Sequence, residues 1–184
     1  MKLMFASDIH GSACYCRRLL DAYHRESPER LILLGDLLYH GPRNDLPDGY
    51  APKEVASMLN ALRDQILCVR GNCEAEVDQM MLDFPVLGDY IALFIDGHTF
   101  ICTHGHLYTE PFPFGDAIVL SGHTHIPMMA KTEYGIRLNP GSVAIPKADS
   151  ARGYLIYQDG VFTRKELGGT VLESLTLCSS NPPA

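Results

Sequence analysis

The chain lacks any run of Lys and Arg. Its 15 basic residues face 22 acidic ones, and the formal net charge is −7. A protein that follows a nucleic-acid backbone needs a basic stripe, so we expect no duplex DNA or RNA as a partner. A small anionic ligand stays open, because a bound divalent cation sets the local charge whatever the sign of the whole protein.

Long apolar segments are missing too. The apolar run at residues 1–6 includes one Lys and ends before Asp8. A signal peptide needs an apolar core of about 7–15 residues, and a membrane span needs about 20. We therefore expect no membrane partner and a cytoplasmic location.

The six cysteines include no Cys-x-x-Cys pair. Their spacing does not indicate a disulfide framework or a cysteine-rich zinc site. Cys68 and Cys102 lie inside apolar runs, where cysteine usually behaves as a small buried hydrophobe. We expect reduced thiols throughout.

What is present is the composition of an ordinary globular protein, with 46% hydrophobic and 20% charged residues. The 184 residues suit one domain with a substantial core. We predict a single domain over residues 1–184, with residues 178–184 as a frayed tail.

Strand-like and helix-like segments alternate in the first half of the chain. We predict strands at 3–6, 31–34 and 66–69, and helices at 15–24, 53–62 and 74–82. This alternation predicts parallel strands joined by crossover helices, and therefore an α/β fold.

The second half consists of short strand-like runs separated by turn signals. We predict strands at 90–95, 98–103, 117–121, 128–131, 136–139, 153–157, 161–166 and 171–177. Asp96-Gly97 and Asp159-Gly160 are typical of hairpin turns.

Two loops are longer than a simple connection requires. Residues 39–52 contain three prolines and two glycines, and residues 105–116 contain Tyr108, Phe112 and Phe114. Long loops in compact domains are often functional, so we expect both to form walls of a substrate cleft. Solvent-facing connections or a contact in a homo-oligomer are the alternatives.

Polar clusters follow five of the predicted strands. They are Asp8-Ile9-His10, Gly35-Asp36, Gly71-Asn72, His104-Gly105-His106 and Gly122-His123-Thr124-His125. Strand ends of an open α/β sheet meet along one edge, where such folds place their chemistry. Each cluster alone has an ordinary explanation as a surface pair, turn or loop, but their joint appearance predicts a metal site.

The spacing within the clusters suggests how they hold ions. In Asp8-x-His10 and His123-x-His125 an extended backbone would turn both polar side chains to one side, so each pair could hold one ion. A glycine before Asp36 lets the backbone turn tightly at the strand end. The two carboxylate oxygens of Asp36 could bridge two cations.

The order of these motifs resembles the calcineurin-like metallophosphoesterases, most closely the small bacterial phosphodiesterases of the YfcE type. The resemblance covers residues 1–147 and includes Phe5-Ala6-Ser7-Asp8-Ile9-His10-Gly11, His40-Gly41-Pro42-Arg43-Asn44, Arg70-Gly71-Asn72-Cys73 and Asn139-Pro140-Gly141-Ser142-Val143. It implies a four-layer α/β/β/α sandwich. It further implies that one ion is held by Asp8, His10 and His125, the other by Asn72, His104 and His123, with Asp36 bridging them.

His104 is the predicted ligand rather than His106 because it directly follows the strand predicted at 98–103. Oxygen and imidazole donors without thiolate suit Mn²⁺, which we expect first, or Ni²⁺, Fe²⁺, Co²⁺ and Zn²⁺. We expect the turn at 139–142 to support the site from behind.

The resemblance implies a dinuclear-metal phosphodiesterase that hydrolyses small phosphoesters by in-line attack of a metal-bound hydroxide. The expected catalytic residues are Asp36, Asn72 and His106, and the expected substrate contacts are Arg43, Asn44, Cys73 and His106. A non-catalytic metal-binding scaffold or regulatory module of the same fold is one alternative. A phosphomonoesterase or single-strand nuclease is another.

Cys73 stands where many members of the superfamily have a histidine that contacts the phosphate or protonates the leaving oxygen. A thiol, with a reference pKa of about 8.5, is a poor acid for an alkoxide leaving group. We therefore hypothesise a preference for diesters or for substrates with good leaving groups. The alternative is that Cys73 only packs, and that His106 or water supplies the proton.

Overall fold

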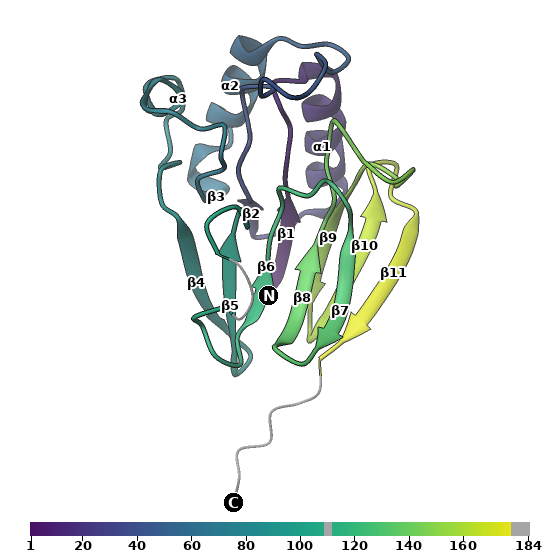
Figure 1. Ribbon diagram of the computed structural model, residues 1–184. Coiled ribbons are helices and arrows are strands. Elements are labelled where there is room, and N and C mark those ends of the chain that lie inside the picture. The colour runs from purple at the N-terminus through teal and green to yellow at the C-terminus, as the bar shows by residue number, and fades with distance from the viewer. Residues whose placement is uncertain (109–111, 178–184) are drawn as a thin grey trace, which may run out of the picture.

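The computed structural model describes residues 1–108 and 112–177, which contain two β-sheets packed face to face (Figure 1). The larger sheet has the strand order β11-β10-β9-β1-β2-β3, and the smaller has the order β4-β5-β6-β8-β7. The tail predicted at 178–184 lies outside the described residues.

The larger sheet consists of β1 (Lys2–Ala6), β2 (Arg30–Leu33), β3 (Ile66–Cys68), β9 (Gly153–Gln158), β10 (Val161–Glu166) and β11 (Val171–Thr176). The smaller sheet consists of β4 (Tyr90–Ile95), β5 (His98–Thr103), β6 (Ile118–Leu120), β7 (Met128–Thr132) and β8 (Gly135–Asn139). The helices are α1 (Ala13–Glu26), α2 (Pro52–Asn60), α3 (Glu76–Met81) and the 3₁₀ turn η1 (Arg63–Gln65).

The first three strands form the parallel unit predicted from their alternation with helices. Ile32 of β2 lies between Phe5 of β1 and Leu67 of β3 in parallel register. All but the first residue of β1 and of β2 are buried, as expected for strands covered on both faces. Their carboxyl ends therefore meet at one edge of the sheet.

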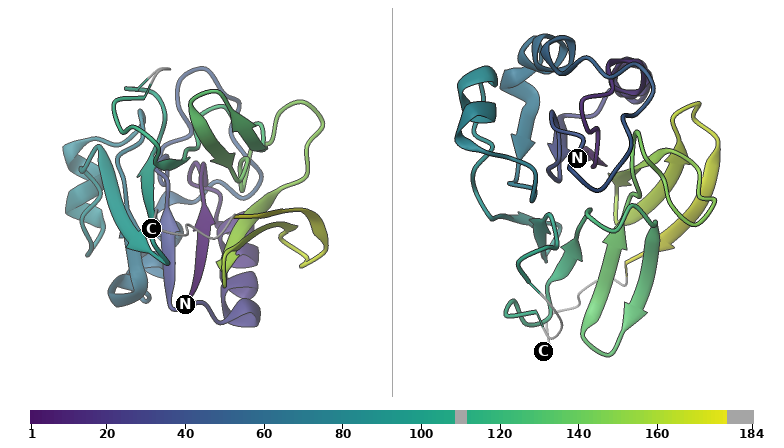
Figure 2. Two further views of the ribbon diagram at one scale, coloured as in Figure 1. Left: turned by 90° about the horizontal axis from the view of Figure 1, so that it is seen from below. Right: turned by 45° about the horizontal axis from the view of Figure 1, so that its top comes forward.

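Two hydrophobic cores lie on the two faces of the larger sheet. Met4 and Ala6 of β1 pack with α1 and α2 residues such as Leu19 and Leu59. Alternate residues of the same strand, including Phe5, pack toward the smaller sheet. The helices accordingly cover the face of β1–β3 that is turned away from the smaller sheet (Figure 2).

The α/β class and the two-sheet sandwich are confirmed. Between β5 and β6 the described residues form a loop in which Phe112 and Phe114 pack on Ile101, Ala117 and Val119 of the smaller sheet's outer face. In the part of the chain described, the smaller sheet is therefore covered by a loop, where the predicted four-layer sandwich has helices. The larger sheet is covered by helices, as predicted.

Local signals set the ends of the helices and hairpins. Ser12 accepts a hydrogen bond from the backbone N–H of Tyr15 at 3.2 Å, so α1 begins at Ala13, two residues before the predicted start. The hairpins β4–β5 and β9–β10 turn at Asp96-Gly97 and Asp159-Gly160, where all four residues have positive φ.

The described cysteines are free, as predicted, and Cys68 and Cys102 are buried in the cores. In the described part of the chain, we find no helix with the length and apolar character that a membrane crossing requires.

Candidate metal centre

The polar clusters predicted at the strand ends meet at one rim of the sandwich. Asp8 and His10 follow β1, Asp36 follows β2, and His104 follows β5. The backbone itself joins the first two segments, since the N–H of Asp8 donates to the carbonyl of Gly35 at 3.1 Å and that of His10 to the carbonyl of Asp36 at 2.9 Å. The rim is thus built by hydrogen bonds between loops that are far apart in sequence.

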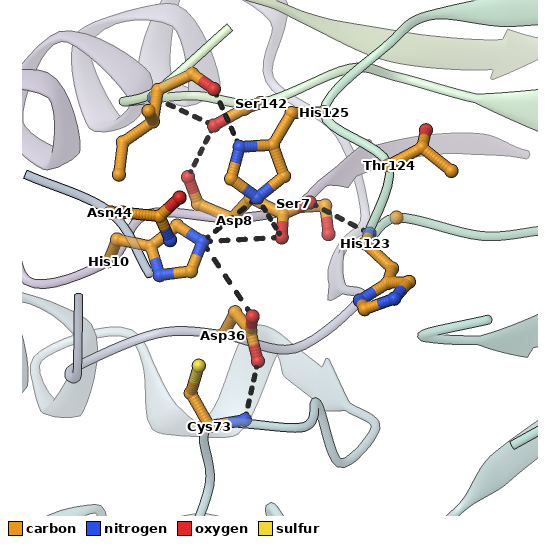
Figure 3. Close-up of polar contacts among 12 residues, drawn as sticks. Ser7, Asp8, His10, Asp36, Asn44, Cys73, His123, Thr124, His125 and Ser142 are labelled. Atoms are coloured by element: carbon orange, nitrogen blue, oxygen red, sulfur yellow. Dashed lines mark hydrogen bonds and ion pairs between the residues drawn. The ribbon is translucent and has the colours of Figure 1, made fainter. Parts of the chain in front are cut away.

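The backbone at these positions is not extended, contrary to our expectation. Five of the predicted ligands have positive φ, between 48° and 65°: Asp8, His10, Asp36, His123 and His125. Left-handed backbone is uncommon outside glycine and clusters at functional sites, where the surrounding fold enforces it. Figure 3 shows that Thr124 points away from the cluster, as predicted. His125 lies with Asp8 and His10, whereas the ring of His123 lies beside that of His104, so these two histidines do not face one ion as a pair.

The first group of side chains is Asp8, His10 and His125, which point toward one another (Figure 3). The Nε2 atoms of His10 and His125 lie 3.1 Å apart. Asp8 Oδ1 lies 3.5 Å from the first of these atoms and 3.3 Å from the second. Three potential ligand atoms from β1 and from the loop after β6 therefore face one small space.

A second group lies beside it and shares Asp36. Asp36 Oδ2 is 3.6 Å from His10 Nε2 and 3.4 Å from His104 Nε2. The same His104 atom lies 3.1 Å from Asn72 Oδ1. A single carboxylate oxygen thus stands between the two groups, which is the position that a bridging ligand needs.

Backbone carbonyls hold three of the imidazole rings by their other nitrogen. Nδ1 of His10 donates to the carbonyl of Tyr39 at 2.9 Å, that of His104 to Leu34 at 2.7 Å, and that of His125 to Ile145 at 2.6 Å. A proton fixed on Nδ1 leaves the Nε2 lone pair free, the arrangement found around metal-binding histidines.

The residues fit divalent metal ions on evidence internal to the fold. Asp8 Oδ1 is buried and has no hydrogen-bond partner among the described residues. An ionised oxygen left unpaired in the interior is costly unless a cation or proton donor completes its surroundings. The neighbouring donors are carboxylate, amide and imidazole, which suit Mn²⁺ and related ions.

The cluster attracts positive charge. Burial alone would raise the pKa of Asp8, but the adjacent imidazoles of His10 and His125 bring it well below its usual range. Burial likewise would lower the pKa of His104, but Asp36 and Asp8 raise it to about 9. The carboxylates are therefore ionised, and they stabilise positive charge beside them, on the imidazoles or on a bound cation that replaces the imidazole protons.

His123 and His106 lie at the outer side of the cluster. The His123 backbone N–H donates to Asp8 Oδ2 at 3.1 Å, and its ring centroid lies 5.0 Å from that of His104. The ring of His106 lies 5.3 Å from that of His104. Burial and the charge of His104 lower the pKa of both outer histidines.

Glu74 is a buried residue that sequence reasoning missed. Its carboxylate accepts hydrogen bonds from the backbone N–H groups of Asp36 at 2.8 Å, Leu37 at 2.7 Å and Gly71 at 2.5 Å. These contacts tie the end of β2 to the segment after β3. Burial and the charge of Asp36 raise its pKa to about 7. Its place three residues after Gly71, directly behind a metal motif, was the available signal.

Three of the four predicted substrate residues, Arg43, Asn44 and Cys73, line a cavity of about 400 Å³ beside the ligand groups, and His106 is not among its lining residues. Arg43 is exposed on its wall, Asn44 donates from Nδ2 to the carbonyl of His40 at 2.8 Å, and Cys73 donates its backbone N–H to Asp36 Oδ1 at 2.9 Å. The loop at 39–52 thus forms a wall, as expected.

The loop at 105–116 differs from that expectation. Its residues Phe112 and Phe114 pack on the outer face of the smaller sheet, and of its described residues only His106 approaches the cluster. An apolar sheet face without a covering helix draws these aromatic side chains away from the rim. Residues 109–111 of this loop lie outside the described residues.

The turn after β8 supports the rim from behind, as expected. Asn139 Nδ2 donates to the carbonyl of Gly122 at 2.7 Å, and Ser142 Oγ donates to the carbonyl of Asp8 at 2.8 Å. Gly122 must be glycine, because a Cβ at that position would overlap Ser7. These contacts fix the segments that present His123 and Asp8.

Comparisons with known proteins identify the family of the chain. Residues 1–158 match the family model of the calcineurin-like phosphoesterase superfamily domain. The chain is 42% identical over 166 residues to the phosphodiesterase YfcE of Escherichia coli K12, which covers 89% of this chain and 90% of that protein. The solved structure of the E. coli phosphoesterase YfcE superposes with a TM-score of 0.91 at 38% identity, over 96% of this chain and 99% of that one.

More distant structures share the fold. Zinc-bound Vps29 of Entamoeba histolytica superposes with a TM-score of 0.63 at 18% identity, covering 96% of this chain and 99% of its own. The family match over most of the sequence, together with the ligand geometry, settles the assignment. The chain belongs to the calcineurin-like phosphoesterase superfamily.

Proposed function

We propose that the protein is a phosphodiesterase that uses two divalent metal ions, with Mn²⁺ as the expected ion. The observation that supports this most directly is the buried Asp8 Oδ1, which has no hydrogen bond among the described residues and faces two imidazole nitrogens. The similarity to phosphodiesterase YfcE supports a diester as the substrate.

The ligands divide as their distances suggest. Asp8, His10 and His125 would hold one ion, and Asn72, His104 and His123 the other. Asp36 would bridge them, since its Oδ2 lies within 3.6 Å of Nε2 in both His10 and His104. His123 is the least constrained member, because its support is the position of its ring beside that of His104.

Two bound ions would polarise the phosphoryl group, acidify a water and balance charge on the attacking and leaving oxygens. The four positive charges of two divalent ions would exceed the two negative charges of Asp8 and Asp36. The rim would therefore attract phosphate although the whole chain is acidic. This electrostatic difference supports a small anionic substrate.

The remaining residues position the substrate. Arg43 at the cavity wall would contact a phosphate oxygen, and Asn44 is held by His40 where it faces the same space. His106, whose ring lies 5.3 Å from that of His104, would donate a proton to the leaving oxygen. With a neutral thiol at Cys73, leaving groups that need little protonation are favoured.

A turnover panel tests the proposal. Metal-free protein is reloaded with Mn²⁺, Ni²⁺, Mg²⁺ or Zn²⁺ and assayed on an aryl phosphodiester, the matching monoester, a cyclic nucleotide and a single-stranded oligonucleotide. We expect the aryl diester to be turned over fastest, and the metal-free protein to be inactive. Faster turnover of the monoester or of the oligonucleotide would indicate a phosphomonoesterase or a single-strand nuclease instead. No turnover of any substrate would favour a non-catalytic metal-binding scaffold.

Three further expectations belong to this proposal. The chain would act as one domain in the cytoplasm, without duplex nucleic acid or a membrane as a partner. The acidic net charge supports the exclusion of duplex nucleic acid. Exposed aromatic residues such as Phe94, 81% exposed, leave room for a homo-oligomer, which sedimentation would detect.

A further inference from the structure

A second cavity, of about 390 Å³, lies against the metal centre and takes no part in the chemistry described so far. Its walls come from the segment 38–50, from the start of α2, and from α3 with the residues before it. The lining residues include Tyr39, Tyr50, Pro52, Cys73, Val77 and Met81. Most of these side chains are apolar, so the cavity differs in kind from the polar rim.

Cys73 is a wall of both cavities. Gly41 passes close on the other side, since a Cβ on it would lie 3.2 Å from Cys73 Sγ. Cys73 also donates its backbone N–H to the carboxylate of Asp36. The polar cavity beside the ligand groups and the apolar cavity thus share one wall, which is Cys73.

The apolar walls are partly exposed to solvent. Tyr39 and Met81 are each 42% exposed, and Val77 is 60% exposed. The two charged residues that line the cavity do not make its floor polar, because Lys53 is exposed and Asp78 accepts a hydrogen bond from the backbone N–H of Ala75 at 2.7 Å. Exposed apolar surface gathered in a hollow is typical of a ligand site.

We propose that this cavity binds an aromatic ester group of the phosphodiester substrate while the phosphate occupies the metal centre. The proposal rests on the proposed function and names its substrate class. Tyr39 and Tyr50 bring aromatic side chains to the lining, and Met81 brings a thioether, and both kinds of group interact favourably with an aromatic ring. The volume lies within the range of small-molecule pockets, about 300–1,000 Å³.

A binding experiment tests the pocket without requiring catalysis. The full chain loaded with Mn²⁺ is titrated calorimetrically with methylphosphonate and with phenyl-, benzyl- and 2-phenylethylphosphonate, whose carbon–phosphorus bonds resist hydrolysis. We expect at least one aromatic phosphonate to bind about tenfold more tightly than methylphosphonate, because its ring leaves water. Equal affinities, or no binding, would overturn the proposal.

Two neighbouring methionines on α3 provide a matched pair of variants. Met81 lines the cavity, whereas Met80 is 84% exposed and does not line it. Met81→Asp should abolish the preference for the aromatic phosphonate, and Met80→Asp should keep it. An equal loss in both variants would contradict the assignment. If Met81→Asp fails to fold by circular dichroism, Val77→Asp carries the same expectation.

The turnover of an aryl diester is measured on the same samples. If the diester is turned over but aromatic phosphonates bind no more tightly than methylphosphonate, the proposed aromatic site is wrong and the proposed phosphodiesterase activity is supported. A preference that Met81→Asp abolishes, without turnover of any diester, would overturn the phosphodiesterase and leave the pocket standing.

Discussion

Two carboxylates with little solvent exposure have contrasting surroundings. Glu26 at the end of α1 accepts hydrogen bonds from Lys165 Nζ at 2.8 Å, Lys2 Nζ at 3.0 Å and Tyr154 Oη at 2.9 Å. Asp8 at the rim is more deeply buried, yet its Oδ1 has no hydrogen-bond partner among the described residues.

The contrast separates structure from function. The Glu26 network joins α1 to β1, β9 and β10 and satisfies the charge it buries, so it stabilises the fold without any ligand. The Asp8 cluster buries charge and leaves it incomplete, in a left-handed backbone enforced by its neighbours. An unsatisfied buried charge is therefore the better guide to a ligand site than burial or charge alone.

The largest expected effect comes from Asp8→Asn. Loss of the ionised oxygen should reduce diester turnover by more than about 100-fold, the upper end for loss of a group that supports a metal ligand. The rise in melting temperature on adding Mn²⁺, which reports binding to the native state, should also shrink. The control is Asp64→Asn, whose carboxylate is exposed. Wild-type metal stabilisation in Asp8→Asn would contradict the site.

Glu74→Gln tests the residue behind the rim. The amide has one acceptor oxygen where the carboxylate serves three backbone N–H groups, so the end of β2 should lose its fixed position. We expect Mn²⁺ affinity to fall about 10–100-fold, as for other supports of metal ligands. Metal titration followed by calorimetry measures it. Glu76→Gln, an exposed position on α3, should behave as wild type.

These two residues also show what the sequence could predict. Asp8 follows an apolar run, and a polar residue at a strand end is visible without coordinates. The same logic predicted the parallel strands and both Asp-Gly hairpins, because each depends on local pattern. Glu74 was assigned to a helix instead, and that helix begins only at Glu76, since Glu74 turns inward to bind β2.

Contacts between remote segments explain the other differences. The positive φ of Asp8 and His10 follows from hydrogen bonds to the segment after β2, which no local pattern of residues 8–10 contains. Phe112 and Phe114 cover an apolar sheet face that exists only once β5 and β6 have paired. Local pattern thus predicted elements and clusters, while long-range contacts set backbone angles and loop positions.

Cys73→His tests the functional site by placing a side chain that can carry a proton and a positive charge beside the metal ligands. We expect the ratio of monoester to diester turnover to rise about tenfold, less than the roughly 100-fold or more of a well-placed general acid, because an introduced histidine is not optimally oriented. The assay compares an aryl diester with its monoester at saturating Mn²⁺. Cys14→His, at an exposed cysteine, is the control. Unchanged selectivity would favour a packing role for Cys73.

Glu26→Gln should affect stability and leave turnover unchanged. The substitution leaves Lys2 and Lys165 without their carboxylate, and both are only partly exposed. We expect the free energy of unfolding to fall by about 1–3 kcal/mol, the usual cost of unpairing buried polar groups. Urea unfolding measures this loss. The control is Glu54→Gln, which breaks an exposed pair with Arg17 and should cost little. An equal loss in both variants would show that the Glu26 network is no more stabilising than an exposed ion pair.

The same network predicts a pH dependence of smaller size. Burial alone would raise the pKa of Glu26, but Lys165, Lys2 and Tyr154 lower it from 4.5 to about 2. A carboxyl whose pKa is lower in the folded state stabilises the fold above pH 4.5, and that contribution disappears as the pH falls from 4.5 to 2. The melting temperature of the wild type should therefore decrease more steeply over this interval than that of Glu26→Gln. Parallel decreases in the two proteins would mean that the Glu26 charge contributes no stability, and that its hydrogen bonds do not distinguish it from the incompletely satisfied charge of Asp8.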